Sequence, residues 1–221
     1  QDGSFRADDM EFRVNTMPCG DDVGEKVDIR LFSLNSSLKN LDDIHFPADD
    51  LKTLRELIEM PFGIILLSGP TGQGKSTTLY ACMRALGPEH FVILSAEDPV
   101  EQYIQGAAQS PIRENYKNQE LSWNYAKFLR AALRQDPDII FVGEIRDTET
   151  AIAAVQASQT GHLVFSTLHT RNAVGTIARL SELGVNPASI LNEMDGVASQ
   201  RLVGINCPHC RQKIISPRNS I

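Results

Sequence analysis

Residues 62–79 read FGIILLSGPTGQGKSTTL and constrain the fold more than any other stretch of the chain. The segment begins with an apolar run that is typical of a buried strand, and this run stops at Ser68. A glycine-rich loop follows and leads into a predicted helix. The loop matches the pattern G-x-x-x-x-G-K-[ST] at Gly69, Gly74, Lys75 and Ser76. Strand, loop and helix in this order predict a phosphate-binding loop.

The residue types of this loop indicate how it would hold a nucleotide. Glycines allow consecutive backbone N–H groups to curl around phosphate oxygens, and the start of the helix adds partial positive charge. We expect Lys75 to reach the β- and γ-phosphates of a nucleotide such as ATP, and Ser76 to ligate Mg²⁺. The predicted nucleotide contacts in the loop are Gly69, Pro70, Thr71, Gly72, Gln73, Gly74, Lys75, Ser76 and Thr77.

Composition limits the partners. The 221 residues suffice for one α/β core and a smaller unit, and 42% hydrophobic with 22% charged residues is ordinary for a soluble protein. No apolar stretch approaches the ~18 residues of a membrane span. The net charge of -7 argues against a nucleic-acid partner, although a local basic groove can exist within an acidic average.

Cysteine usage favours a reducing compartment. Four cysteines, at positions 19, 82, 207 and 210, lack the spacing of a disulfide framework. Free thiols and the lack of a visible signal peptide suit the cytoplasm. The chain has no initiator Met, and residues 216–221 carry no structure signal, so we expect a fragment of a longer protein.

The first 46 residues have the alternating pattern of strands, at Glu11–Met17 and Lys26–Phe32. We expect an antiparallel hairpin at the edge of a separate small domain, with its apolar face packed. The opposite, exposed face is basic and carries Arg13, Lys26 and Arg30. Asn35–Phe46 is expected to be a linker.

From Pro47 onward, helical patterns alternate with apolar strands. Helices are predicted at Pro47–Pro61, Thr77–Leu86, Leu121–Arg134, Thr148–Gln159, Asn172–Leu183 and, capped by Asn186, from Pro187 to about Ser199. Besides the strand before the loop, strands are predicted at Phe91–Ser95, Ile139–Val142 and Leu163–Thr167. This alternation predicts an α/β fold with a parallel sheet covered on both faces.

In such sheets, ligands collect at the carboxyl ends of the strands. Glu144 follows Ile139–Val142, and we expect it to polarise the attacking water, because phosphoryl transfer depends on positioning and charge stabilisation. Many related sites close this strand with Asp, where the chain has Gly143. We therefore expect Mg²⁺ to be held by Ser76, phosphate oxygens and waters.

Several other polar residues near strand ends have two interpretations. Glu97 and Asp98 are alternatives for water or metal contact, or are turn residues, and Glu101 is a weaker alternative. His169 follows the strand Leu163–Thr167 and suits sensing of the γ-phosphate, whereas His162 precedes it and belongs near the amino end. Either histidine can instead be structural.

Basic and thiol groups give further hypotheses. Guanidinium groups brace phosphate charge, and ring-forming ATPases often receive them from another domain or subunit, a role that suits Arg13 and Arg30 better than Lys26. The more usual role, solvation or acid pairing, stays open for Arg130, Arg134 and Arg146.

Cys207 and Cys210, with His209 between them, form half of a zinc-ribbon pattern. The alternative is a reduced dithiol, with Zn²⁺ bound only in a longer form of the chain.

Together these motifs resemble the secretion ATPase superfamily, specifically the type II secretion and type IV pilus-extension branch. The resembling segments are SGPTGQGKSTTLY (Walker A), ILSAEDPVE (Asp box), LRQDPDIIFVGEIRD (atypical Walker B) and TGHLVFSTLHT (His box). The CPHC motif favours this branch over the retraction branch. The chain departs from the family in a longer connection over Ser110–Ser122 and in the lack of a second cysteine pair.

The resemblance implies a RecA-like P-loop NTPase domain at residues 47–206. The end of a PAS-like amino-terminal domain with its linker would cover residues 1–46, and a cysteine-motif region would begin at 207–221. It further implies a cytoplasmic hexamer, peripheral to the inner membrane, that hydrolyses ATP to assemble pilins or pseudopilins through a membrane platform protein. The matching site residues are Lys75, Ser76, Glu97, Glu144, His162, His169, Arg13 and Arg30.

Two functions of other classes remain open from the sequence. One is a nucleotide-dependent binding module with negligible hydrolysis, against which Glu144 and the arginines argue. The other is a nucleic-acid translocase on the same core, which the net charge of -7 and the lack of a basic or aromatic stripe disfavour.

Overall fold

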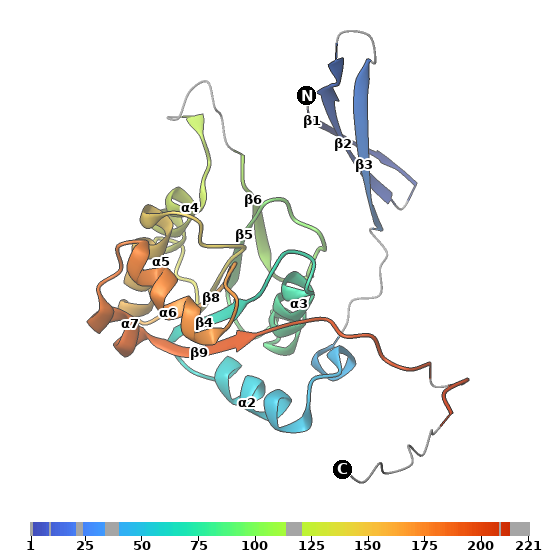
Figure 1. The fold of residues 1–221 in the computed structure, drawn as a ribbon. Helices are drawn as coiled ribbons and strands as arrows, with labels where there is room; N and C mark the ends of the chain where they lie inside the picture. The colour runs from blue at the N-terminus through green and yellow to red at the C-terminus, as the bar shows by residue number, and fades with distance from the viewer. Residues whose placement is uncertain are drawn as a thin grey trace.

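The computed structural model describes residues 2–8, 10–20, 24–33, 40–113, 121–207 and 209–212. It contains a small antiparallel sheet, an α/β part and an extended C-terminal segment (Figure 1). Among these residues, no helix is long and apolar enough to cross a membrane. Part of the predicted linker, the middle of the Ser110–Ser122 connection and residues 213–221 lie outside the described residues.

The centre of the α/β part is a six-stranded sheet in the order β6-β5-β7-β8-β4-β9, in which every neighbouring pair is parallel. The strands are β4 (Gly63–Ser68), β5 (Ile93–Glu97), β6 (Ala108–Pro111), β7 (Ile139–Val142), β8 (Leu163–Leu168) and β9 (Met194–Ser199). All residues of β4, β7 and β8 are buried, as expected for strands that are covered on both faces.

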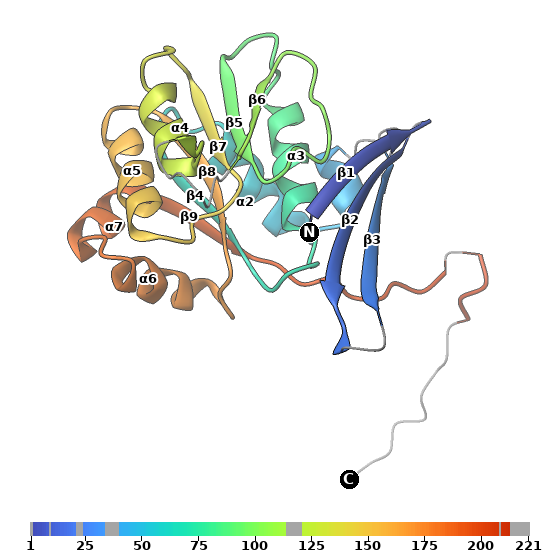
Figure 2. The ribbon, with the colours of Figure 1, turned by 90° about the horizontal axis from the view of Figure 1, so that it is seen from above.

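Helices cover both faces of this sheet (Figure 2). One core cluster joins the sheet to η1 (Leu41–Ile44), α2 (Ala48–Ile58) and α3 (Lys75–Ala85). The other cluster joins it to α4 (Tyr125–Ala132), α5 (Thr148–Gln159), α6 (Ala173–Glu182) and α7 (Pro187–Glu193). The predicted parallel α/β fold with two covered faces is confirmed.

Local sequence signals account for several of these elements. Asp147 caps α5 by accepting a hydrogen bond from the Thr150 backbone N–H at 2.8 Å, and Asn186 caps α7 through the Ala188 N–H at 2.8 Å. The bounds predicted for β7 and α5 agree with the structure. In β7 and α5, the pattern of apolar residues and the residues at the ends of the segment indicate the same bounds, so the prediction is accurate there.

The helix predicted from Pro187 to Ser199 is wrong beyond Glu193. Residues Met194–Ser199 form the edge strand β9, which pairs with β4. The sequence MDGVAS carries little strand signal, and its pairing depends on tertiary packing: a Cβ at Gly196 would lie 2.6 Å from Leu57 Cδ1 of α2. A larger residue here would require the Leu57 side chain to move, so glycine favours this close approach of β9 to α2.

Other predicted bounds need smaller corrections. β5 begins at Ile93 rather than Phe91, which is exposed. α4 begins at Tyr125 rather than Leu121, because the Asn124 side chain caps the Lys127 N–H at 2.9 Å. The strand β6 was not predicted, since its sequence AQSP is short and polar.

The N-terminal residues form an antiparallel sheet of β1 (Asp2–Ala7), β2 (Met10–Pro18) and β3 (Glu25–Ser33). The predicted hairpin is confirmed as β2 and β3, and β1 is an additional strand. Arg13 lies opposite Arg30 in the register, so both belong to one face of the sheet.

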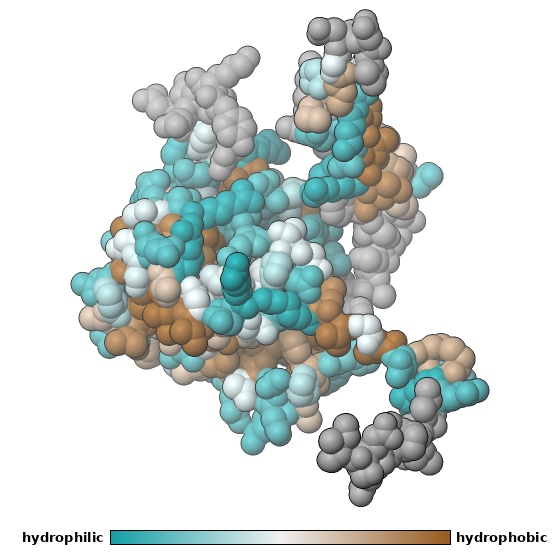
Figure 3. All heavy atoms as spheres, viewed as in Figure 1, coloured by the Kyte–Doolittle hydropathy of each residue, from teal (hydrophilic) through white to brown (hydrophobic). Residues whose placement is uncertain are grey.

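The prediction that the apolar face of this sheet is packed is wrong. The side chains of Val27, Ile29 and Leu31 are 52%, 49% and 59% exposed. Apolar residues accordingly line one side of this sheet in the space-filling view (Figure 3). Their alternation indicated which residues share a face, but it carried no information about what covers that face.

Candidate active site

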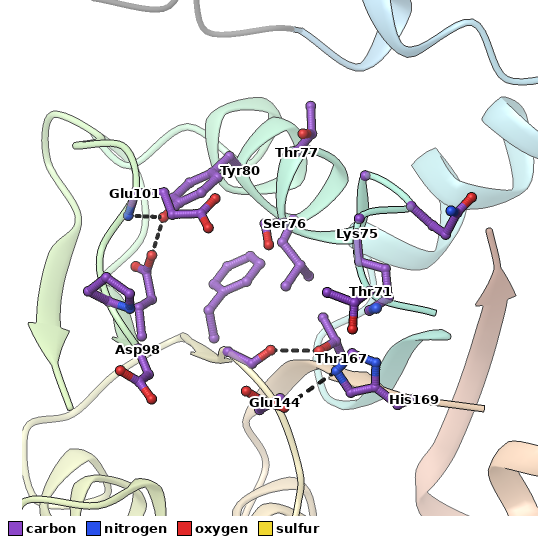
Figure 4. Close-up of a pocket in the computed structure, with 18 of the residues that line it drawn as sticks. Thr71, Lys75, Ser76, Thr77, Tyr80, Asp98, Glu101, Glu144, Thr167 and His169 are labelled. Atoms are coloured by element: carbon purple, nitrogen blue, oxygen red, sulfur yellow. Dashed lines mark hydrogen bonds and ion pairs between the residues drawn. The ribbon is translucent and has the colours of Figure 1, made fainter. Parts of the chain in front are cut away.

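The loop after β4 and the residues that follow β5, β7 and β8 enclose one pocket (Figure 4). Its lining includes Thr71, Gly72, Gln73, Gly74, Lys75, Ser76, Thr77, Glu97, Asp98, Glu101, Glu144, His169 and Arg30. The carboxyl ends of parallel strands meet at this edge of the sheet, which is where the strand-end rule expects a ligand. The structure therefore brings most of the predicted site residues together.

Lys75 lies on the inside of the phosphate loop. Its side chain is buried, and its Nζ donates hydrogen bonds to the carbonyl oxygens of Gly69 at 2.7 Å and Pro70 at 2.9 Å. Burial lowers the pKa of Lys75, while the nearby Glu144 carboxylate opposes this shift. An anionic phosphate is a stronger hydrogen-bond partner for an ammonium group than a neutral carbonyl, so Lys75 is suited to exchange these contacts for a phosphate.

The residues present fit Mg²⁺, which prefers oxygen ligands and keeps several waters. Ser76 presents an exposed hydroxyl in the first turn of α3, and the carboxylates of Glu144 and Asp98 line the same pocket. No group of three or more His, Cys, Asp or Glu residues that could hold a metal exists in the described ranges. Ser76, with phosphate oxygens and waters, would hold the metal.

Glu144 extends from the end of β7 with only 14% of its side chain exposed. It forms an ion pair with Arg146, and its Oε2 lies 3.5 Å from His169 Nε2. The Arg146 guanidinium hydrogen-bonds to Glu144, and this contact raises the pKa of Arg146. A carboxylate held from two sides in this way has a fixed direction across the pocket from Lys75.

The structure explains why the acid follows Gly143 rather than replacing it. A Cβ at Gly143 would lie 3.0 Å from the Tyr125 hydroxyl and 3.1 Å from the Ala96 carbonyl oxygen. The Gly143 carbonyl also accepts a hydrogen bond from Thr167 Oγ1 at 2.8 Å. This position leaves little room for an Asp side chain, so the first acid that can face the pocket is Glu144.

Glu97 also lies in the pocket, but its carboxylate already accepts three hydrogen bonds from protein groups. It is 7% exposed and accepts hydrogen bonds from the Tyr80 hydroxyl, from Ser95 Oγ at 2.5 Å and from Gln109 Nε2 at 2.9 Å. Desolvation raises the pKa of Tyr80, and the Glu97 charge adds to this effect. These contacts favour a positioning role for Glu97 over the activation of water.

We expect Tyr80→Phe to destabilise the protein by about 1–3 kcal/mol, because it leaves the buried Glu97 carboxylate without one donor. The substitution also removes the acceptor of the Glu101 N–H, which lies 2.9 Å from the Tyr80 hydroxyl. Denaturant unfolding measures the effect. Tyr103→Phe, at a side chain that is 62% exposed, is the control. Equal changes in both variants would contradict this account.

The two histidines lie at opposite ends of β8. His169 follows the strand, lines the pocket and contacts Glu144, while its predicted role near the phosphates stays a prediction. His162 precedes the strand, lines a different cavity and has its Nδ1 3.0 Å from the Ala157 carbonyl oxygen. The structure does not bring His162 to the nucleotide pocket, so its predicted contact with nucleotide has no support from the geometry of one chain.

The arginines divide into two groups. Arg30 lines the pocket, and the Arg13 charge opposes the rise in the pKa of Glu101 that desolvation causes. Arg30 therefore reaches the pocket from the N-terminal sheet, whereas Arg13 is not part of the lining and acts on Glu101 only through its charge. By contrast, Arg130 pairs with Glu149 at 2.9 Å, and Arg134 donates to the Arg130 carbonyl at 2.8 Å, the ordinary surface roles that the sequence left open.

Cys207 and Cys210 are exposed free thiols in the C-terminal segment. Hydrogen bonds from the backbone N–H groups of Cys210 and His209 lower the pKa of the Cys207 thiol. The described ranges bring no further ligand to this pair. The residues present therefore do not complete a zinc site, and the prediction that Zn²⁺ needs a longer form of the chain stays a prediction.

Sequence reasoning missed three polar residues that line the pocket, Tyr80, Tyr125 and Thr167. It also missed Gln200, which is not part of the lining but contacts the phosphate loop. Thr167 and Gln200 follow the strand-end rule that identified Glu144, and Thr167 was available from the predicted end of its strand. Gln200 was hidden because β9 was predicted as a helix. The two tyrosines have no sequence signal, since their partners are distant along the chain.

A glycine-rich loop between a buried strand and a helix, facing an acid from the end of another strand of the same parallel sheet, defines a RecA-like P-loop protein. Residues 2–221 match the model of the Type II/IV secretion system protein family, and the chain belongs to this family.

Named relatives agree with this assignment. The chain is 47% identical over 203 residues to the type II secretion system ATPase E of Vibrio cholerae and 44% identical over 204 residues to the type II secretion system protein E of Pseudomonas aeruginosa. Each alignment covers 92% of this chain and 39% of the relative. The chain thus spans about two fifths of the length of these proteins.

Solved structures share the fold. The pilus retraction motor PilT with bound ADP superposes with a TM-score of 0.76 at 33% identity, covering 92% of this chain and 59% of that one. The ATPase DotB of Legionella pneumophila gives a TM-score of 0.72 at 29% identity, covering 92% and 57%. These similarities confirm the predicted RecA-like class and the predicted family.

Proposed function

We propose that the protein binds ATP with Mg²⁺ in this pocket and hydrolyses it. The observation that carries the proposal is the position of Glu144, which faces the phosphate loop from the end of β7, with β8 lying between β7 and β4 in the sheet. The names of the relatives, which include an ATPase E, support the same activity. Steady-state ATP hydrolysis by the oligomeric protein, compared with Glu144→Gln, tests the proposal.

Each group in the pocket has a distinct part in this reaction. Lys75 and the loop N–H groups neutralise phosphate charge, and Ser76 contributes a hydroxyl ligand to the metal. Bound Mg²⁺ would supply charge neutralisation and orientation of the phosphates. Glu144 accepts a hydrogen bond from the attacking water, while Arg146 and His169 fix the direction of its carboxylate. Glu97 supports the pocket wall through Tyr80.

The basic face of the N-terminal sheet supplies the remaining positive charge. Arg30 has an exposed guanidinium that pairs with Asp28 at 3.9 Å, and such a loose surface pair costs little to exchange for a phosphate. Arg13 acts from the same face. Movement of this sheet relative to the loop would therefore couple the nucleotide to the arrangement of the two parts.

For the whole protein, we propose a hexameric motor at the cytoplasmic face of the inner membrane. It would use ATP to assemble pilins or pseudopilins in type II secretion or pilus biogenesis, through a membrane platform protein. Family membership and the names of the relatives support this assignment. The pocket receives positive charge from the separate N-terminal sheet. This arrangement fits a ring in which the N-terminal sheets move relative to the phosphate loops.

We expect Arg30→Ala to lower kcat about tenfold, because the pocket keeps other cations that share the bracing of transition-state charge. Stability should change by less than about 0.5 kcal/mol, since the side chain is exposed. The control is Lys26→Ala. Lys26 lies on the same strand as Arg30 but is absent from the pocket lining. Equal turnover in the two variants would remove Arg30 from the site.

A further inference from the structure

Gln200 directly follows the edge strand β9, yet its side chain is only 6% exposed. Both ends of its amide contact the phosphate-loop region, more than a hundred residues away in sequence. Oε1 accepts a hydrogen bond from Thr78 Oγ1 at 2.8 Å, and Nε2 donates to the Gln73 carbonyl at 2.8 Å. The backbone N–H of Gln200 donates to the Ser68 carbonyl at 2.8 Å. Gln200 thus contacts the residue before the loop, Ser68, a residue near the end of the loop, Gln73, and a residue of helix α3, Thr78.

The partners of the amide also fix its orientation. The Gln73 carbonyl oxygen is only an acceptor, so the NH₂ end of Gln200 must face it. The Thr78 hydroxyl then donates to the oxygen end. Since a buried amide costs free energy unless its donors and acceptors are paired, these two contacts hold the side chain in one conformation.

The residues after β9 run close against the loop. The Leu202 backbone N–H donates to Gln73 Oε1 at 2.8 Å. A Cβ at Gly69 would lie 2.6 Å from the Gln200 carbonyl oxygen, and one at Gly74 would lie 2.9 Å from Gln200 Nε2. Two glycines of the motif therefore leave room for this segment. With φ of 147° and 78°, they also adopt backbone conformations that favour glycine.

The contact with Gln73 has a direct consequence for phosphate binding. In a trans peptide the C=O and the N–H point in opposite directions. Because Gln200 holds the Gln73 carbonyl on its own side, the N–H of Gly74 in the same peptide must point away from Gln200. Gly74 and Lys75 line the pocket and begin helix α3, where N–H groups serve as anion donors.

On the basis of the proposed nucleotide-binding function, we propose that Gln200 is a positioning residue of the phosphate loop. Its amide fixes the peptide between Gln73 and Gly74 so that the N–H faces the phosphates. Segment 200–202 is accordingly a second wall of the loop. The chain that continues to Cys207 and Cys210 is attached directly to this wall, so its displacement would change the affinity for phosphate.

The test compares Gln200→Ala and Gln200→Glu with Gln159→Ala, a control at an exposed glutamine on α5. Glu keeps the size and the acceptor for Thr78 but places an oxygen opposite the Gln73 carbonyl. Calorimetric titration of the purified protein with ATP and with inorganic pyrophosphate gives the affinities. Steady-state kinetics separates KM from kcat, and hydrogen exchange reports on residues 72–76.

We expect both Gln200 variants to lose about tenfold in affinity for ATP and for pyrophosphate, with kcat at saturation within about threefold of wild type. Exchange at residues 72–76 should rise, while the control should match wild type. Affinities within twofold of wild type in either folded Gln200 variant would overturn the proposal, as would a loss of ATP affinity without a loss for pyrophosphate. If wild type itself fails to bind ATP, the proposed function fails, and pyrophosphate binding then judges Gln200 alone.

Discussion

Glu144→Gln should abolish most ATP turnover while leaving nucleotide binding intact. The amide has the same size but cannot accept a proton or orient water as a carboxylate does, and a general base contributes about 10²–10⁴-fold to the rate. We therefore expect kcat to fall by about two to four orders of magnitude, with the Kd for ATP within about threefold of wild type. Stopped assays of phosphate release and a binding titration measure the two quantities.

The matched control for this variant is Glu149→Gln. Glu149 is a glutamate on α5 that pairs with Arg130 at 2.9 Å and is absent from the pocket lining. It should keep wild-type turnover. If Glu144→Gln also keeps it, Glu144 does not activate water. If that variant loses binding together with turnover, Glu144 acts on the nucleotide or on the fold.

Lys75→Ala should act on binding rather than on the chemical step alone. Among the described residues, Lys75 is the only lysine that lines the pocket. Loss of a charge-assisted contact to phosphate should raise the Kd for ATP on the order of 10²-fold, equivalent to about 2.7 kcal/mol. Titration with ATP and with ADP at saturating Mg²⁺ measures the change.

Lys52→Ala is the control for this substitution. Lys52 lies on α2 in an exposed pair with Glu56 at 3.8 Å, so its loss should leave nucleotide affinity unchanged. Circular dichroism should report a folded protein for both variants. An ATP affinity of Lys75→Ala that equals that of Lys52→Ala would exclude the phosphate contact assigned to Lys75.

The sequence predicted which residues would meet in one pocket wherever the order of residues along the chain is sufficient to decide it. The loop from Gly69 to Ser76 is contiguous, and Glu144 follows a strand whose apolar run is unmistakable. Once the strands are known to be parallel, their carboxyl ends must lie together. No knowledge of strand order was needed to bring Lys75, Glu144 and His169 to one pocket.

The missed features depend on which elements become neighbours. β9 has a weak strand pattern and is a strand because β4 offers a free edge and Gly196 fits against Leu57. Gln200 owes its role to that pairing. Likewise, the sequence gives Tyr80 as a helical aromatic residue and cannot indicate that its hydroxyl reaches Glu97. The exposed apolar face of the N-terminal sheet was missed for a similar reason. The alternation of apolar and polar residues shows which side chains share a face, but not which element packs against that face.

Glu144, Lys75 and Arg30 line one pocket, and their arrangement supports one central proposal, the hydrolysis of ATP in a reaction that depends on Mg²⁺. The most direct measurement is steady-state phosphate release by the oligomeric wild-type protein with Mg²⁺ and with excess chelator, alongside ATP binding in the same preparation. The account predicts turnover that requires Mg²⁺ and that Glu144→Gln removes. ATP binding without any turnover above the Glu144→Gln background would contradict it and would leave a nucleotide-dependent binding module.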